Sequence, residues 1–378
     1  MSKNKVVLGV PKETKDHETR VAGTPTSVKK WIKQGFRVMV ERSAGASAGF
    51  PDEAYSAEGA ELGDATAALG ADVVLKLNRP TPAEVSKMKR GALLISFLDG
   101  YLNDGLLERL AQGAVDSIGM ELLPRTSRAQ SMDALSSQAN IAGYRAALEA
   151  ATRYKRFFPM MMTSAGSAKP AKVAVLGAGV AGLQAIPTAK KLGAMVEAYD
   201  IRPEVKEQIT SVGAKFIELD LEESGTGTGG YAKELSEAGK QKQQALLNEK
   251  LKKFDIIIST ANIPGRKAPV LITEEAVKGM RFGSVIIDMA ASTGGNCPLT
   301  EPDKIIVKHG VTIVGITNWA ALVPADASEF YARNVANLLA LLVQEDPQNG
   351  PALKMNLEDD IIAAALAVYR GEIRFKKK

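Results

Sequence analysis

The residues with the clearest chemical meaning are the glycines of the sequence Gly177-Ala178-Gly179-Val180-Ala181-Gly182. An apolar run precedes them, a helical pattern follows, and a second apolar run ends at Asp200. In such a motif the first glycine permits a tight turn, the second lets the backbone approach a pyrophosphate, and the third lets the helix pack on the strand. The N–H groups and the dipole at the helix start attract phosphate. The pattern therefore predicts a dinucleotide site.

Asp200 lies about twenty residues after the first glycines, where a carboxylate can accept both ribose hydroxyls of adenosine. A 2′-phosphate would be repelled there, so the site is predicted to prefer NAD to NADP. Arg202 complicates this preference slightly, and its simplest interpretation is a solvated surface charge. Pro187 falls inside the predicted helix, where it costs about 3 kcal/mol unless the helix kinks.

The composition is that of a globular protein with two domains. The chain has 378 residues, 45% of them hydrophobic and 24% charged, and its net charge of +5 is small for this length. No basic–aromatic stripe predicts nucleic-acid binding. The single cysteine, Cys297, excludes an internal disulfide framework and fits a reducing compartment. We expect no secretory leader, no metal site and no membrane span, since no apolar stretch reaches about eighteen residues.

Strand-like and helix-like runs alternate along most of the chain. Strands are expected near residues 6–10, 37–40, 72–77, 92–97, 117–121, 172–176, 195–199, 255–260, 284–290 and 311–316. Thr24 and Pro25 predict a helix start. This alternation predicts an α/β fold with two Rossmann-like, doubly wound parallel-sheet domains separated by a nucleotide-binding cleft. The first domain is expected to span residues 1–136 plus 325–378, without a nucleotide fingerprint, and the second, NAD(H)-binding domain residues 137–324.

Four further segments have distinct patterns. Residues 131–154 have the spacing of one long helix, and residues 330–342 that of an apolar helix. Residues 158–162 include three adjacent methionines, which fit either an exposed hairpin that packs on a partner or a core strand. The glycine-rich residues 225–231 are expected to form a mobile loop.

Residues 124–138, with the sequence PRTSRAQSMDALSSQ, are far more specific than the glycine motif. Together with residues 142–145, 158–162, 177–182 and 294–297, they closely resemble the NAD(H)-binding component of proton-translocating transhydrogenases, in a family that includes alanine dehydrogenase. The resemblance runs in order over nearly the whole chain. Ser292, Asn262 and Trp319 depart from the family pattern, Asn262 where an apolar residue commonly lines the adenine pocket.

The resemblance implies a role for particular residues. Arg125, Gln130, Asp133 and Ser136 would form a loop that orients the nicotinamide and its ribose without acid–base chemistry, and Gln130 would face the second nucleotide. Helix capping and surface charge are the alternative for these four. Val180 would approach the pyrophosphate, Tyr231 would close over the site and Gln243 would line the adenosine side. The remaining predicted cofactor-binding residues are Gly177, Gly179, Ala181, Gly182, Asp200, Arg202, Gly230 and Asn262.

Two chemistries must be separated. An amino acid dehydrogenase needs a group that titrates near neutral pH, and related alanine dehydrogenases use a lysine and a histidine. This chain keeps Arg20 and Lys76, but residues 95–100 contain no histidine, and the only two are His17 and His309. Direct hydride transfer between two nicotinamides needs alignment and exclusion of water instead. With one nucleotide fingerprint, the second nucleotide must come from another subunit.

These features predict a subunit that binds NADH and passes hydride to NADP⁺ held by a partner. The resemblance further implies a homodimer, formed through residues 158–169, and membrane-embedded partner subunits that include an NADP(H)-binding domain and move protons. The chain would then be cytoplasmic, peripheral on the cytoplasmic face of the bacterial inner membrane. The alternatives are a stand-alone alanine-dehydrogenase-like enzyme and a non-catalytic NAD(H)-sensing subunit.

Overall fold

The structure, a computed structural model, describes residues 5–219, 237–262, 265–346 and 350–375. The chain divides into two compact units. Unit 1 comprises Met1–Gln138 and Ala320–Lys378, and unit 2 comprises Ala139–Trp319. Within the described ranges, no helix combines the length and the apolar character needed to cross a membrane.

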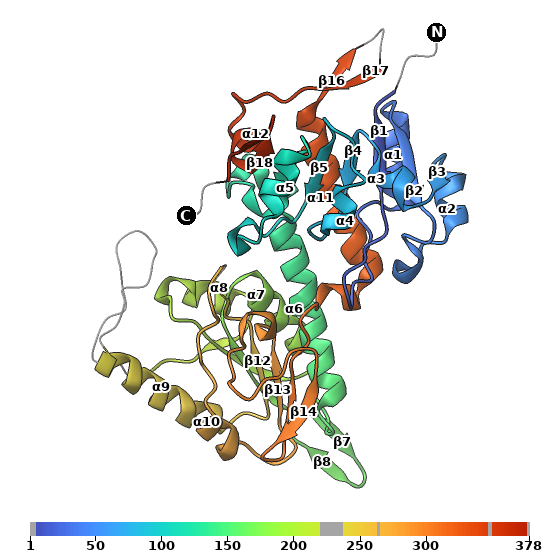
Figure 1. The fold of residues 1–378 in the computed structure, drawn as a ribbon. Helices are drawn as coiled ribbons and strands as arrows, with labels where there is room; N and C mark the ends of the chain where they lie inside the picture. The colour runs from blue at the N-terminus through green and yellow to red at the C-terminus, as the bar shows by residue number, and fades with distance from the viewer. Residues whose placement is uncertain (1–4, 220–236, 263–264, 347–349, 376–378) are drawn as a thin grey trace. The chain divides into compact units, whose positions relative to one another are not determined.

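Unit 1 contains an eight-stranded sheet in the order β19-β18-β6-β5-β4-β1-β2-β3 (Figure 1). The neighbours from β3 to β6 pair in parallel, whereas β18 and β19 are antiparallel. The central strands are buried on both faces, as apolar runs such as that of β4 predict. Their bounds are β1 Val7–Val10, β2 Arg37–Glu41, β3 Glu61–Gly63, β4 Val73–Leu75, β5 Leu93–Ser96, β6 Asp116–Gly119, β18 Leu366–Tyr369 and β19 Glu372–Ile373.

Helices and a separate hairpin complete unit 1. The Thr24 side chain caps helix α1 by accepting from the Ser27 N–H, as the sequence predicts. The helices are α1 Pro25–Lys33, α2 Asp52–Ala57, α3 Ala65–Leu69, α4 Pro82–Val85, α5 Leu106–Gln112, α11 Pro324–Leu342 and α12 Asp360–Ala365. Strands β16 (Val343–Asp346) and β17 (Gly350–Leu353) form the hairpin.

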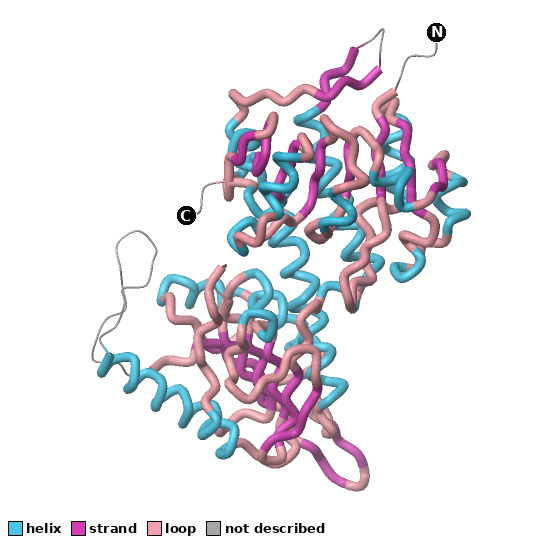
Figure 2. The backbone as a smooth tube through the Cα atoms, viewed as in Figure 1, coloured by secondary structure: helices cyan, strands magenta, loops and turns pink. Residues whose placement is uncertain are grey.

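Unit 2 contains a seven-stranded sheet in the order β11-β10-β9-β12-β13-β15-β14, parallel except for β14. Its strands lie at the centre of the unit with helices around them, as Figure 2 shows. The chain order of the strands reverses between β9 and β12, the place where such sheets bind ligands. The strands are β9 Lys172–Leu176, β10 Met195–Tyr199, β11 Lys215–Phe216, β12 Ile256–Ser259, β13 Val285–Asp288, β14 Ile305–Lys308 and β15 Val311–Val314. The helices are α7 Val180–Lys191, α8 Lys206–Ser211, α9 Glu237–Leu251 and α10 Glu274–Gly279. Helix α6 (Ala134–Arg153) contains the division between the units.

Two α/β units with parallel-dominated sheets confirm the predicted fold class. The methionine segment forms an exposed hairpin, β7 (Met161–Thr163) with β8 (Gly166–Ala168), and not a core strand. Pro187 lies inside the continuous helix α7. The single helix expected over 131–154 is wrong at its start: Ser127–Met132 is a 3₁₀ helix, and Asp133, with ψ 87°, separates it from α6.

Candidate functional site

The glycine turn between β9 and α7 has the geometry that its sequence predicts. Gly177 has φ +95°, in the left-handed region, and its N–H donates to the Tyr199 carbonyl at 2.8 Å. A Cβ on Gly182 would lie 1.9 Å from the Gly177 carbonyl oxygen. A Cβ on Gly179 would meet no atom of the described residues within 4 Å. Packing thus requires the first and third glycines, and the second leaves open surface.

That open surface lies at the start of α7. Gly179 is the N-cap and supplies no side chain to the first N–H groups of the helix, which have no partner within it. Val180 is exposed and Ala181 half-buried. A dinucleotide pyrophosphate fits this position, because it needs close backbone approach and exposed N–H donors.

Asp200 follows β10 and is bonded directly to the glycine turn. The carboxylate is 8% exposed. Oδ2 accepts from the Ala178 N–H at 2.7 Å, and Oδ1 accepts from the Arg202 N–H at 2.9 Å. The Arg202 guanidinium also donates to both oxygens, at 2.9 and 3.0 Å. The interpretation of Arg202 as a solvated surface charge is therefore wrong, because it pairs with the predicted ribose-binding acid.

These contacts determine the charge state of Asp200. Burial raises the pKa of the carboxyl, but the hydrogen bonds from Arg202 and from the Ala178 N–H outweigh it, so the pKa lies below its usual range. The carboxylate is therefore ionised at neutral pH and can accept ribose hydroxyls.

Gln243 lies beside this acid, as the sequence predicts for the adenosine side. Its Nε2 donates to the Tyr199 hydroxyl at 2.7 Å and so joins α9 to the end of β10. Burial and the neighbouring Asp200 charge raise the pKa of Tyr199 to about 12. The phenol therefore stays neutral and holds Gln243 in place.

The sequence did not identify the residues that brace the turn from β12 and β13. Thr260 Oγ1 donates to the Gly177 carbonyl at 3.0 Å. Asn296 is fully buried, and its Nδ2 donates to the carbonyls of Ala261 and Pro269, both at 2.8 Å. The Gly-Gly-Asn-Cys stretch at 294–297 was the available signal, but it did not show that its amide holds the segment after β12.

Asn262, in that segment, is exposed and accepts from Thr293 Oγ1 at 3.0 Å. Cys297 is buried, and burial raises the pKa of its thiol to about 11, so it is inert at neutral pH. Gly230 and Tyr231 lie outside the described residues.

The predicted nicotinamide loop belongs to unit 1. Arg125 and Gln130 are exposed, and Gln130 lies in the 3₁₀ helix before α6. Asp133 accepts from the Ser136 N–H at 2.9 Å and from Ser136 Oγ at 2.5 Å. Asp133 thus caps the start of α6, the structural alternative for a residue of this type. A contact with nicotinamide stays a prediction for all four loop residues.

Lys76 is buried among carboxylates. Its Nζ lies 2.8 Å from Glu84 and 3.4 Å from Glu13. Burial lowers the pKa of Lys76, but the charges of Glu13 and Glu84 outweigh it, so the pKa lies above its usual value. Arg20 is likewise paired, with Glu18 at 2.7 Å. Lys76 is therefore a charged structural residue and not a base at neutral pH.

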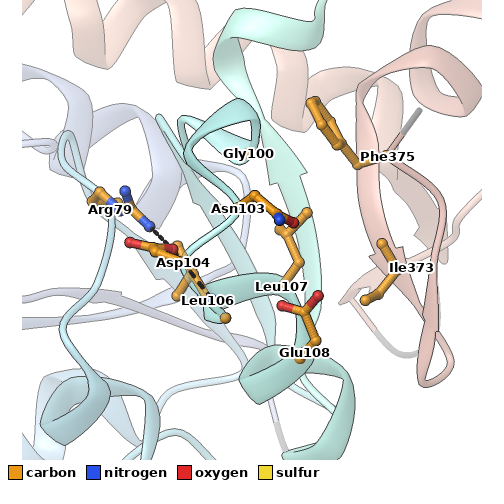
Figure 3. A pocket seen from close by; sticks show the side chains of 10 residues that line it. Arg79, Gly100, Asn103, Asp104, Leu106, Leu107, Glu108, Ile373 and Phe375 are labelled. Atoms are coloured by element: carbon orange, nitrogen blue, oxygen red, sulfur yellow. Dashed lines mark hydrogen bonds and ion pairs between the residues drawn. The ribbon is translucent and has the colours of Figure 1, made fainter. Parts of the chain in front are cut away.

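Two cavities of unit 1, of about 170 and about 400 Å³, share Arg79, Asp104 and Leu106. Figure 3 shows the smaller one, with Arg79 turned toward Asp104 in a 2.6 Å ion pair and Phe375 on the opposite side. Both cavities are lined by residues of unit 1, whereas the glycine turn belongs to unit 2. The glycine turn therefore lines neither of these two cavities.

Comparison with known proteins gives consistent matches over the chain. Residues 9–142 match the family "Alanine dehydrogenase/PNT, N-terminal domain", and residues 146–376 match "Alanine dehydrogenase/PNT, C-terminal domain". A chain of NAD(P) transhydrogenase subunit alpha from Rhodospirillum rubrum is 49% identical over 375 residues, covering 97% of each chain.

Two other relatives define the range of the similarity. The crystal structure of transhydrogenase from Sinorhizobium meliloti superimposes with a TM-score of 0.88 at 43% identity, covering 97% of this chain and 99% of that one. Alanine dehydrogenase of Bacillus subtilis is 30% identical over 380 residues, covering 98% of this chain and 93% of the relative. The chain belongs to the alanine dehydrogenase/PNT family.

Proposed function

We propose that this chain binds NAD(H) on unit 2 and passes hydride directly between NADH and NADP⁺ held on a partner subunit of a proton-translocating transhydrogenase. The observation that carries the proposal is the ionised Asp200 bonded to the Ala178 N–H of the glycine turn. It combines a backbone cradle for pyrophosphate with an acid for the adenosine ribose. The relatives named NAD(P) transhydrogenase subunit alpha support the same function.

Asp200 selects the nucleotide in this proposal. Its two oxygens would accept the two ribose hydroxyls, while a 2′-phosphate would meet a negative charge. Arg202 already donates to both oxygens, so it would share the carboxylate with the ribose or turn aside. Gln243 would line the adenosine from α9, with Asn262, Gly230 and Tyr231 as further contacts.

The unit 1 loop would orient the reacting ring. Bound NADH supplies a hydride from its nicotinamide, and the chain has to align the ring and keep out water. A carboxamide has one acceptor and two donors, which Arg125, Asp133 and Ser136 can satisfy in one rotation of the ring. Gln130, exposed on the 3₁₀ helix, would face the second nucleotide. No acid or base is required.

An alanine dehydrogenase would require such a group, and the surroundings of Lys76 argue against one. The ammonium is held between Glu13 and Glu84, and its pKa is raised. His17 is exposed in a turn with φ +59°. His309 is also exposed and bonds Glu274 at 3.0 Å. Neither environment is that of a desolvated catalytic base.

We also propose that the chain forms a homodimer through the β7–β8 hairpin. It would dock on membrane-embedded subunits, which place it on the cytoplasmic face of a bacterial inner membrane. The hairpin projects from unit 2 in Figures 1 and 2 and exposes Met160, Met161 and Met162. Exposed apolar side chains grouped in this way are typical of protein–protein contact sites.

The test mixes the purified chain with a separately produced NADP(H)-binding domain. We expect transhydrogenation between NADH and an NADP⁺ analogue in the mixture and in neither component alone. Oxidation of alanine with NAD⁺ by the isolated chain would overturn the proposal in favour of the dehydrogenase. NADH binding without turnover in any mixture would favour a sensing subunit.

A further inference from the structure

The loop that carries Gln130 is held from behind by two asparagines of α11, whose roles neither the sequence patterns nor the comparisons identify. Asn334 Nδ2 donates to the Ser131 carbonyl at 2.9 Å, and Asn337 Nδ2 donates to the same oxygen at 3.0 Å. A carbonyl oxygen has two lone pairs, so it can accept both bonds. Together the two amides hold the backbone one residue after Gln130.

Asn334 also grips the far side of Asp133. Its Oδ1 accepts from Ser137 Oγ at 2.7 Å. The side chain therefore joins residues on both sides of Asp133, the point where the 3₁₀ helix ends and α6 begins. Asn334 is 7% exposed, so water competes little for these bonds.

Apolar anchors decide which side of the loop faces outward. Ala129 and Met132 are 1% and 4% exposed and belong to the core of unit 1, whereas Gln130 and Ser131 are exposed. The packing of Ala129 and Met132 fixes the depth of the loop. The asparagines add what apolar packing lacks, since a hydrogen bond is directional and fixes the rotation of the peptide group.

We propose that Asn334 and Asn337 are positioning residues for hydride transfer, which hold the backbone of residues 127–133 so that Gln130 is presented in one orientation. The proposal rests on the proposed function for its kinetic consequence, but the clamp itself can be tested without activity. Hydride transfer depends steeply on alignment, so a loosened loop should slow the reaction more than it weakens nucleotide binding. NADH binding relies mainly on unit 2.

The test uses three variants of α11. Asn337→Asp keeps the shape of the side chain but removes the donor. Asn334→Ala removes the whole buried bridge. Arg333→Ala changes an exposed neighbour on the same helix and is the matched control. Thermal unfolding identifies any variant that fails to fold, and Asn337→Asp is the less disruptive of the two clamp changes.

The first readout is hydrogen–deuterium exchange of the Ala129 and Asp133 amides, which bond the Thr126 and Gln130 carbonyls within the loop. We expect their exchange to accelerate about tenfold in both asparagine variants and to be unchanged in the control. Unchanged exchange in both variants would overturn the clamp.

The second readout separates rate from affinity in the mixture with the NADP(H)-binding domain. We expect hydride transfer to slow about tenfold while the Kd for NADH changes less than about threefold. Equal loss of rate and affinity would overturn the positioning role. If the unmodified chain shows no transhydrogenation, the proposed function fails, and the exchange measurement still decides the clamp.

Discussion

Asp200 has two sets of partners at the scale of single residues. It bonds the glycine turn through the Ala178 N–H, and it neutralises Arg202. The spacing from the glycines predicts the acid and its position, because strand length and turn geometry follow from local sequence. The pairing with Arg202 could not be predicted, because it depends on which way a long side chain folds back. The same holds for Lys76, whose lowered or raised pKa depends on carboxylates from elsewhere in the chain.

Asp200→Asn tests the proposed ribose acid. We expect the Kd for NADH to rise about 10- to 100-fold, since hydrogen bonds to charged groups contribute about 1.5–3 kcal/mol. Binding of NADPH should weaken less, because the repelling charge is gone. Fluorescence titration of both nucleotides measures this, with the exposed Glu207→Gln on α8 as control. An unchanged NADH affinity would exclude Asp200 from the site.

Glu18 provides a prediction for the pH dependence of stability. Its side chain is fully buried beside Arg20. Burial raises the pKa of this carboxyl, but Arg20 lowers it more, to about 2 from the ordinary 4.5. Because the folded-state pKa is depressed, the stabilisation is complete above about pH 4.5 and is lost as the pH falls toward 2. The difference corresponds to about 3 kcal/mol.

Glu18→Gln should therefore lower the free energy of unfolding by about 3 kcal/mol at pH 7, and the difference should shrink by roughly half or more at pH 3. Urea unfolding at the two pH values measures it. The exposed pair of Glu301 with Lys304 provides the control, where Glu301→Gln should cost less than about 1 kcal/mol. A difference independent of pH would contradict the assignment.

At the scale of elements, the start of α7 is positioned by close contact with α6. A Cβ on Gly143 would lie 2.0 Å from the Ala181 carbonyl oxygen, so only glycine allows this approach. Asn140 Nδ2 also donates to Gln184 Oε1 at 3.1 Å across the same contact. The helices themselves follow from sequence periodicity. Their contact does not, because one glycine among many carries no sign of which backbone it meets.

Gly143→Ala pits helix propensity against this contact. Alanine favours a helix by about 1 kcal/mol over glycine, but the added methyl would press on backbone and cost about 1–3 kcal/mol or displace α7. We expect lower stability and an approximately tenfold weaker NADH affinity, measured by thermal unfolding and titration. Thr152→Ala, exposed on the same helix, is the control. A more stable variant with normal affinity would mean that α7 is not held by this contact.

At the scale of the whole molecule, the two α/β units follow from the alternation of strands and helices. The sequence missed the antiparallel edge strand β14 and the change from α12 to β18 within residues 360–369, because short amphipathic runs fit either structure until the sheet edge selects one. The predicted domain limits, after residues 136 and 324, stay predictions. So does the place of Tyr231 in the site.

The β7–β8 hairpin allows a test of the proposed dimer. Met162 is 76% exposed, so Met162→Lys should leave the folded unit intact while placing a charge in the interface. We expect sedimentation equilibrium to show a shift from dimer to monomer. Met195→Lys, at a 52% exposed methionine on β10, should leave the mass unchanged. An unchanged mass for the Met162 variant would place the contact elsewhere.

The central claim is that hydride passes from ring to ring without an intermediate carrier, and isotope transfer measures this most directly. NADH deuterated at C4 of the nicotinamide is mixed with the chain, the NADP(H)-binding domain and NADP⁺ in ordinary water. We predict that one face of the labelled carbon transfers its deuterium quantitatively to C4 of NADPH. Deuterium lost to water, or transfer that appears only when alanine or pyruvate is added, would contradict direct transfer.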